Sequence, residues 1–456
     1  MKRNTVSALL VILGSFLVLF QARWGVAAYG NDESCYLEWL HRFIGSEFPM
    51  CYSHSHPWGV SLLWVPMGLI AKGLAGILHA NLESILLPLV GLFSFACWGL
   101  SLILLHKVIL IRNPHFRFRL TALLFFCIPV INYVFRYPFF AHSGELLLTV
   151  LSFYFLLTHR PILACLIAVW LCFTRPYDAL IAGVVMGYAL DSPNEKLRRP
   201  LRIGATVLAA AALFLFVRIG FFTGYHGLKL VDAFHTLRWL SLERILFGFG
   251  GLVWWDAWCL FLLALGMTAF RRLSWMDRAS WAWLLALFLL HINPSKLWDE
   301  LQPRYLIGAY VGAILLFARL EPTLPARWRR VGLTLASFQA VSQLYLFWTT
   351  PYYVLRHFGP ITDTVDPTFA QLALLLHPWD LLPLAGLSPV PFTLFSWLHA
   401  LPMFQRFANY GHYALKGPTL LIFTAFVALT LIAFLHLLRC GSLRHKTRSP
   451  LVDRNS

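Results

Sequence analysis

The sequence YGNDESCYLEWLHRFIGSEFPMCYSHSHPWGVSLLWVP, residues 29–66, gathers the densest group of polar side chains in an otherwise apolar chain. Two acids follow directly after the first apolar run, and Asp32 is the first of them. The spacing predicts a short helix over residues 31–43, with Asn31 or Asp32 at its N-cap and Gly45 as its stop. One face of this helix is apolar, so we expect that face to lie against lipid or protein at a membrane surface.

The rest of the chain is more apolar than soluble domains are. Hydrophobic residues make up 59% and charged residues 12% of the 456 residues, and the mean hydropathy is +0.68. The recurring apolar runs predict an all-α polytopic membrane protein with about twelve transmembrane helices. The expected spans are residues 5–21, 85–106, 120–135, 144–158, 161–174, 177–190, 203–222, 246–269, 279–291, 305–319, 331–349 and 418–438.

The net charge of +17 is distributed unevenly along the chain. With a cytoplasmic N-terminus, the inner loops carry roughly twice as many Lys and Arg residues as the outer loops, which is the positive-inside pattern. The basicity therefore reflects topology, and we expect no nucleic-acid partner. We expect both termini in the cytoplasm and the polar face in the periplasm, as in a bacterial inner-membrane protein. Residues 58–78 are apolar enough to span, but a crossing there would invert every later loop, so we expect a helix at the outer interface.

A single domain is expected over residues 1–456, with interfacial helices in the first outer loop, residues 22–84. The last outer segment, residues 350–417, is long, aromatic and Pro-rich, and its apolar patches are able to re-enter the bilayer. Cys35 and Cys51 both face the outer compartment in this topology. In an oxidising compartment they would form a disulfide; two free thiols are the open alternative.

Ionisable residues also occur within apolar runs and at the outer ends of several spans. Asp256 and Arg218 lie inside apolar runs, where each is either functional or explained by mutual pairing or snorkelling to the interface. The sequence contains no GxGxxG, P-loop, zinc-ribbon or HExxH motif. Polar residues that begin or end the outer junctions are Arg136, His142, Glu145, Arg175, Asp178, Arg304 and Tyr305.

Five segments resemble the GT-C superfamily of membrane glycosyltransferases, which includes protein O-mannosyltransferases and lipid A aminoarabinose transferases. These segments are NDESCYLEW, SHSHPWGVSLLWVP, AHSGELLLTVLSFYF, FTRPYDAL and LQPRYLIGAY. The resemblance covers the whole architecture. It implies an inverting transfer of a sugar from a polyprenyl-phosphate donor to a lipid, glycan or protein acceptor on the outer face, with membrane lipid around the site.

The resemblance also implies roles for individual residues. Asp32 matches the position of the usual catalytic base, Glu33 completes the Asp-Glu pair after the first span, and Glu145 matches a second outer acid where Asp is commoner. The expected catalytic residues are Asp32, Glu33 and Glu145. The chemistry of the residues adds Arg side chains for the donor phosphate and a divalent metal, zinc, manganese or magnesium. The expected donor-phosphate contacts are Arg304, Arg175 and Arg136; the expected metal ligands are Asp32, His54 and His56; the expected substrate contacts are Tyr36, His142, Asp178 and Tyr305.

Other interpretations stay open. Asp32 has an alternative as a helix cap, and His54 and His56 have one as ordinary interface histidines. A transporter or flippase of lipid-linked sugars would place polar residues deep in the membrane on broken helices. An O-antigen polymerase or ligase and a non-catalytic scaffold subunit are further alternatives.

Overall fold

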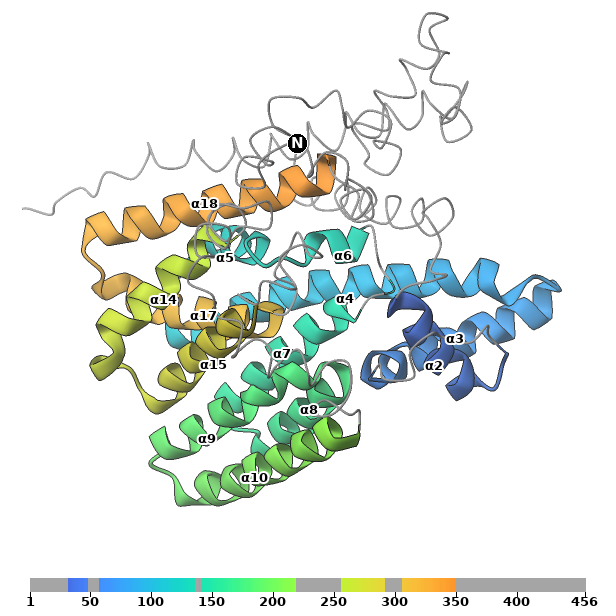
Figure 1. Cartoon of the computed structure of the whole chain (residues 1–456), viewed down its shortest axis with the longest axis horizontal. Coiled ribbons are helices and arrows are strands. Elements are labelled where there is room, and N and C mark those ends of the chain that lie inside the picture. The colour runs from blue at the N-terminus through green and yellow to red at the C-terminus, as the bar shows by residue number, and fades with distance from the viewer. Residues whose placement is uncertain are drawn as a thin grey trace, which may run out of the picture.

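The computed structural model describes residues 32–47, 57–135, 139, 141–218, 256–291 and 306–349, and these residues form helices with no strand among them (Figure 1). The predicted first and last spans, residues 350–417 and parts of the first outer loop lie outside these ranges. The helices are α2 Asp32–Ile44, α3 Gly59–Leu78, α4 Leu82–Arg112, α5 Phe118–Phe126, α6 Ile131–Phe135, α7 His142–Leu157, α8 Pro161–Thr174, η1 Pro176–Leu180, α9 Ile181–Asp191, α10 Glu195–Arg218, α14 Ala257–Ala269, η3 Phe270–Arg272, α15 Trp275–His291, α17 Ile307–Leu320, η5 Glu321–Thr323 and α18 Ala326–Thr349.

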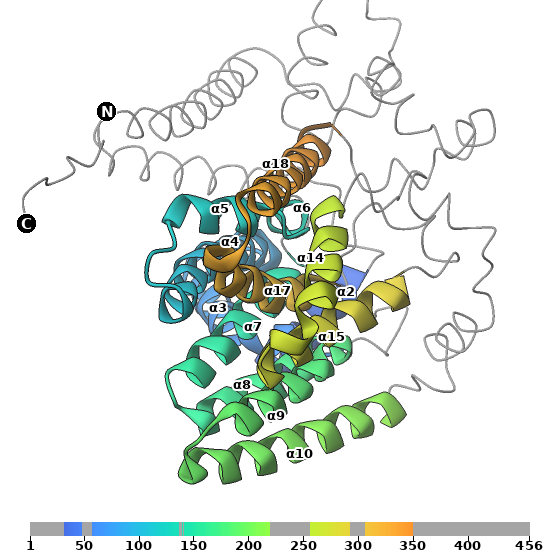
Figure 2. The same ribbon diagram turned by 90° about the vertical axis from the view of Figure 1, so that its left-hand side faces the viewer.

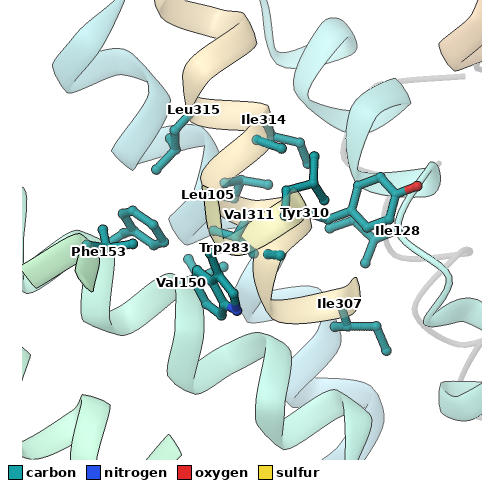
Figure 3. Packing of buried hydrophobic residues seen from close by; sticks show 14 of the residues in the cluster. Leu105, Ile128, Val150, Phe153, Trp283, Ile307, Tyr310, Val311, Ile314 and Leu315 are labelled. Carbon is teal, nitrogen blue, oxygen red and sulfur yellow. The ribbon is translucent and has the colours of Figure 1, made fainter. Parts of the chain in front are cut away.

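The centre of the bundle is α17, whose sequence IGAYVGAILLFARL is apolar on all sides. A helix of that kind must be covered all round, and every residue from Ile307 to Ala318 is buried. It packs against α4, α7, α14 and α15 (Figures 1 and 2). Small residues permit this close approach: a Cβ on Gly312 would lie 3.0 Å from Ser280 and 3.4 Å from Phe153. Figure 3 shows the apolar side chains of α17 among those of its neighbours.

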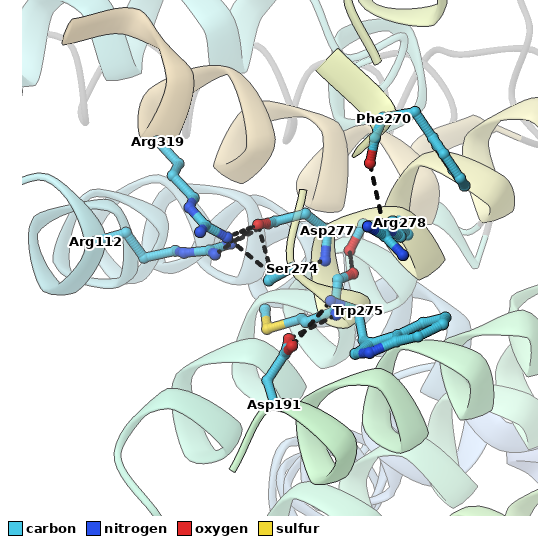
Figure 4. A network of polar contacts seen from close by, with 10 residues as sticks. Arg112, Asp191, Phe270, Ser274, Trp275, Asp277, Arg278 and Arg319 are labelled. Atoms are coloured by element: carbon cyan, nitrogen blue, oxygen red, sulfur yellow. Dashed lines mark hydrogen bonds and ion pairs between the residues drawn. The ribbon is translucent and has the colours of Figure 1, made fainter. Parts of the chain in front are cut away.

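Polar contacts join several helix ends at one end of the bundle, which we call the Asp277 end (Figure 4). Arg112, at the end of α4, donates to both oxygens of Asp277, at 2.7 and 3.1 Å, and Arg319 of α17 pairs with the same carboxylate. Asp191, at the end of α9, accepts from the first two backbone amides of α15, those of Trp275 and Met276. The short connections then place the starts of α7, η1 and α17 at the opposite end, which we call the Glu145 end.

A separate unit consists of α2, α3 and the first part of α4, and it has its own apolar core. The predicted apolar face of α2 packs on α3, with Leu40 and Ile44 against Gly68. The predicted stop is confirmed: Gly45 has a φ of +64°, its amide donates to Arg42 O, and the next amide donates to His41 O. This is a Schellman motif, in which only glycine is unstrained.

Lys72 explains how α3 tolerates a charge within its apolar sequence. Its ammonium donates to Ile44 O at 2.7 Å and to Gly45 O at 3.1 Å, so it neutralises the carbonyl end of α2.

Within the part of the chain that the structure describes, two helices, α3 and α4, are long and apolar enough to cross a membrane. The 31 residues of α4 give it a length of about 46 Å, against about 30 Å for the hydrocarbon core of a bilayer. Its first dozen residues pack with α2 and α3, and the rest joins the main core. Residues 120–135 do not form one helix as predicted. The chain breaks after Phe126, because Pro129 cannot donate a backbone hydrogen bond.

Candidate functional site

Four of the predicted site residues meet at the Glu145 end, although they come from two different connections. His142 and Glu145 lie in the first turn of α7, and Asp178 lies in the short 3-10 helix that follows α8. Arg175 lies between α8 and that 3-10 helix in an extended conformation. All four side chains are buried. A buried group of two acids, one guanidinium and one imidazole is costly to assemble and is typical of functional sites in membrane proteins.

The carboxylate of Glu145 is the hub of the cluster. Its Oε2 lies 3.2 Å from Arg175 Nε and 3.0 Å from His142 Nδ1. Its Oε1 accepts from the backbone amide of Gly308, in the first turn of α17, at 3.3 Å. Arg175 Nη2 lies 3.1 Å from both ring nitrogens of His142, and the imidazole in turn packs on the Tyr133 ring at a centroid distance of 4.2 Å. These contacts fix the carboxylate from three sides.

Asp178 completes the cluster on the other side of Gly308. Its carboxyl lies next to that of Glu145. Neither carboxyl oxygen of Asp178 has a hydrogen-bond partner within the described residues. A Cβ on Gly308 would lie 2.4 Å from Asp178 Oδ1, so only glycine lets this carboxyl approach the start of α17. The cluster therefore joins two carboxyls, one guanidinium and the amide end of a buried helix, which together can move a proton. Another anion would reach Arg175 and the Gly308 amide only by displacing Glu145 from them.

The first turn of α3 joins this cluster to α2. Ser61 Oγ donates to the Tyr36 carbonyl at 2.7 Å. On its other side, the backbone of Gly59 approaches that of Thr174 so closely that a Cβ would lie 2.4 Å from the Thr174 amide nitrogen. A Cβ on Gly144 would lie 3.1 Å from side chains of the same α3 turn. The residues next to Arg175 and Glu145 thus contact the turn that also holds α2.

The structure describes three of the remaining predicted site residues and leaves five outside its described ranges. Asp32 and Glu33 are the first two residues of α2, so the predicted helix start agrees with the structure to within one residue. Tyr36, expected at the substrate, is buried and packs edge-on against Trp64 at 6.5 Å. The others, Arg136, Arg304, Tyr305, His54 and His56, lie outside the described residues.

The predicted disulfide is supported at one of its two ends. Cys35 is buried and disulfide-bonded. Cys51 lies outside the described residues, so the identity of the partner stays a prediction.

Within the described ranges, no group of three or more His, Cys, Asp and Glu side chains could hold a metal ion. Glu145 already contacts the guanidinium of Arg175, whose positive charge disfavours a cation there. These residues do not fit a metal site, and the predicted metal depends on Asp32, His54 and His56, whose side chains are not described.

Sequence reasoning missed Gly308 and Tyr133. Gly308 acts through its backbone amide and its missing side chain, and Tyr133 acts through ring packing. Their one available signal was position, since Gly308 follows shortly after Arg304 and Tyr305 and Tyr133 shortly precedes Arg136.

Comparisons with protein-family models, with curated proteins and with solved structures find no match for this chain.

Proposed function

We propose that the protein is a multi-pass membrane glycosyltransferase that moves a sugar from a polyprenyl-phosphate donor to a hydroxyl or amine acceptor at the Glu145 end of the bundle. The observation that carries the proposal is the convergence of Glu145, Arg175 and the start of α17 in one buried cluster. The resemblance of the sequence segments to the GT-C superfamily supports it as well.

The proposed membrane location has support beyond α3 and α4. Large apolar side chains are exposed on the outward faces of several further helices, and a folded soluble bundle rarely exposes so many. Lipid would cover them in a membrane. These side chains include Ile162, Leu163, Leu166, Ile203, Val207 and Phe214.

The proposed reaction is a single displacement at the anomeric carbon. The acceptor oxygen or nitrogen attacks that carbon and gives its proton to a carboxylate, for which Asp32 is the candidate. The bond from the sugar to the phosphate breaks, and its electron pair leaves with the phosphate oxygen. Arg175 and the amide end of α17 would stabilise that oxygen once it displaces Glu145 from them. Inversion and the outer-face location follow from the family resemblance. A divalent metal held by Asp32, His54 and His56 stays a prediction.

Deletion of the gene and complementation test this function. The deleted strain receives wild type, Asp32→Asn or the matched control Glu38→Gln, and its surface lipids and glycans are compared by mass spectrometry. Both substitutions remove one carboxylate from α2, and Glu38 pairs with Arg42, whose side chain is 49% exposed, so water recovers part of the cost of losing that pair. We expect wild type and the control to restore a sugar-sized mass that Asp32→Asn does not restore. If an Asp32→Asn protein that inserts normally restores the full amount of that mass, Asp32 is not the catalytic base.

A transporter or flippase of lipid-linked sugars is the second candidate, favoured by one specific observation. The predicted span over residues 120–135 is broken, and the carbonyl of Cys127 at the break accepts from Gln339 beside the buried Asp256. Broken helices with buried polar groups occur at the substrate sites of transporters. Movement of a lipid-linked sugar into vesicles without any transfer product would favour this function.

A further inference from the structure

A second buried polar cluster lies on another side of α17, where α14 and α18 meet the break between α5 and α6. Asp256 directly precedes α14, and its side chain is 1% exposed. Its Oδ1 accepts from the Tyr310 hydroxyl at 2.5 Å. Its Oδ2 is buried and has no hydrogen-bond partner within the part of the chain that the structure describes. The glycosyl-transfer proposal makes no use of this carboxyl.

The direction of every hydrogen bond in this cluster is fixed by backbone groups. Gln339 Oε1 accepts from the backbone amide of Trp258, which can only donate, at 2.9 Å. Gln339 Nε2 donates to the carbonyl of Cys127, which can only accept, at 2.8 Å. The second hydrogen on Nε2 therefore points to Tyr310 Oη, 2.8 Å away. Because Oη accepts there, the hydroxyl hydrogen of Tyr310 is free to donate to Asp256.

No cation among the described residues balances Asp256. The groups that face it are the Tyr310 hydroxyl on α17, the Cys127 thiol at the helix break, the Cys259 thiol on α14 and the amide of Gln339 on α18. Not one of them carries a positive charge. An ionised carboxylate in this buried place would have one oxygen without a donor among the described residues, which is far more costly than a neutral acid in the same place.

We propose that Asp256 is a proton-binding site: its carboxyl holds a proton on Oδ2 while Oδ1 accepts from Tyr310. Binding adds one proton to the carboxylate and breaks no bond. Release of the proton would leave a negatively charged carboxylate with a single hydrogen-bond donor, the Tyr310 hydroxyl. Water or a cation would then have to enter beside the first turn of α17 to stabilise that charge. Proton occupancy therefore changes the strength of the hydrogen bond from Tyr310, which is stronger to an ionised carboxylate. This inference stands independently of sugar transfer.

Infrared spectroscopy of the purified full chain in lipid, in light and heavy water at neutral pH, tests the proposal. The spectrum of wild type minus that of Asp256→Asn should contain the carbonyl band of a protonated carboxylic acid, shifted down in heavy water. Tyr310→Phe, which removes one hydroxyl and keeps the ring, should move that band to higher frequency, because Oδ1 loses its donor. The matched control is Asp191→Asn, whose carboxylate caps α15 and is exposed; it should remove carboxylate bands alone.

Two results would overturn the proposal. A difference spectrum in which Asp256→Asn removes carboxylate bands would mean that Asp256 is ionised. An acid band that Tyr310→Phe leaves unmoved would belong to another carboxyl, and this second result decides the question even where Asp256→Asn fails to fold.

Discussion

Replacement of Asp277 by asparagine should destabilise the protein strongly. The carboxylate is 1% exposed and accepts from Arg112, Arg319 and Ser274. Asparagine keeps the shape but leaves two guanidinium groups without a negative partner. Breaking a fully buried pair costs about 3–5 kcal/mol. The side chains of Arg112 and Arg319 are 12% and 38% exposed, so water recovers part of that cost. We expect the lower end, about 3 kcal/mol of unfolding free energy.

The measurement is denaturant unfolding of the full chain in detergent, followed by tryptophan fluorescence. The matched control is Glu321→Gln at the same end of the bundle, because Glu321 pairs at 3.4 Å with the more exposed Arg329. That control should cost less than about 1 kcal/mol. Equal losses in the two variants, or no loss in Asp277→Asn, would mean that the network does not hold the helix ends together.

The same comparison has a defined dependence on pH. Burial acts to raise the pKa of Asp277, but Arg112, Ser274 and Arg319 outweigh burial and hold the pKa below its ordinary value. The ionised carboxylate therefore stabilises the folded state fully above the unfolded pKa, about 4. The difference in unfolding free energy between wild type and Asp277→Asn should be complete at pH 7. It should shrink as the pH falls below about 4 and toward the lower pKa that Asp277 has in the folded state. A difference that grows on acidification would contradict the assignment.

Three further predictions concern other parts of the chain. Gly308→Ala should destabilise the protein by about 1–3 kcal/mol in thermal unfolding, because its Cβ would overlap Asp178, whereas Gly183→Ala, whose Cβ meets nothing within 4 Å, should be neutral or slightly stabilising. In denaturing, non-reducing buffer, where burial no longer protects Cys35, wild type should take up one maleimide fewer than Cys51→Ala, as judged by a gel shift. Uptake of one more by wild type would exclude the pair. In a variant whose remaining cysteines are replaced, Glu195→Cys should react with an impermeant maleimide only after cells are opened, and labelling of intact cells would invert the predicted topology.

The sequence was sufficient for the all-helical class and for the bounds of several described helices, because these follow from local patterns. The start of α2 and its stop at Gly45 have specific chemical signals, which depend on nearby residues alone. His142, Glu145, Arg175 and Asp178 were predicted on one face from the alternation of spans. The structure brings them together because short connections between antiparallel helices place alternate helix ends side by side.

The parts that the sequence could not provide depend on long-range geometry. The amide of Gly308 reaches Glu145 across 163 residues, and a backbone donor has no residue type to mark it. From the sequence, we expect Asp256 to be functional, to pair with Arg218 or to reach the membrane interface by snorkelling. In the structure it accepts a hydrogen bond from the neutral hydroxyl of Tyr310. Hydropathy also cannot separate one span from two short helices, since the residues around Pro129 are as apolar as those on either side.

The two buried clusters share one turn of α17. Gly308 and Tyr310 are two residues apart, so their Cβ directions differ by about 200° around the helix axis: that of Gly308 faces Asp178, and the Tyr310 side chain reaches Asp256. The Gly308 amide, at the start of the same turn, donates to Glu145. A rotation or a shift of this turn must therefore alter both contacts at once. Because α17 is covered on every side, such a shift is possible only if its neighbours move with it. The hydrogen bond from Tyr310 to Asp256, which helps to hold this turn, thus also helps to hold the Gly308 amide on Glu145, beside the proposed leaving-group site.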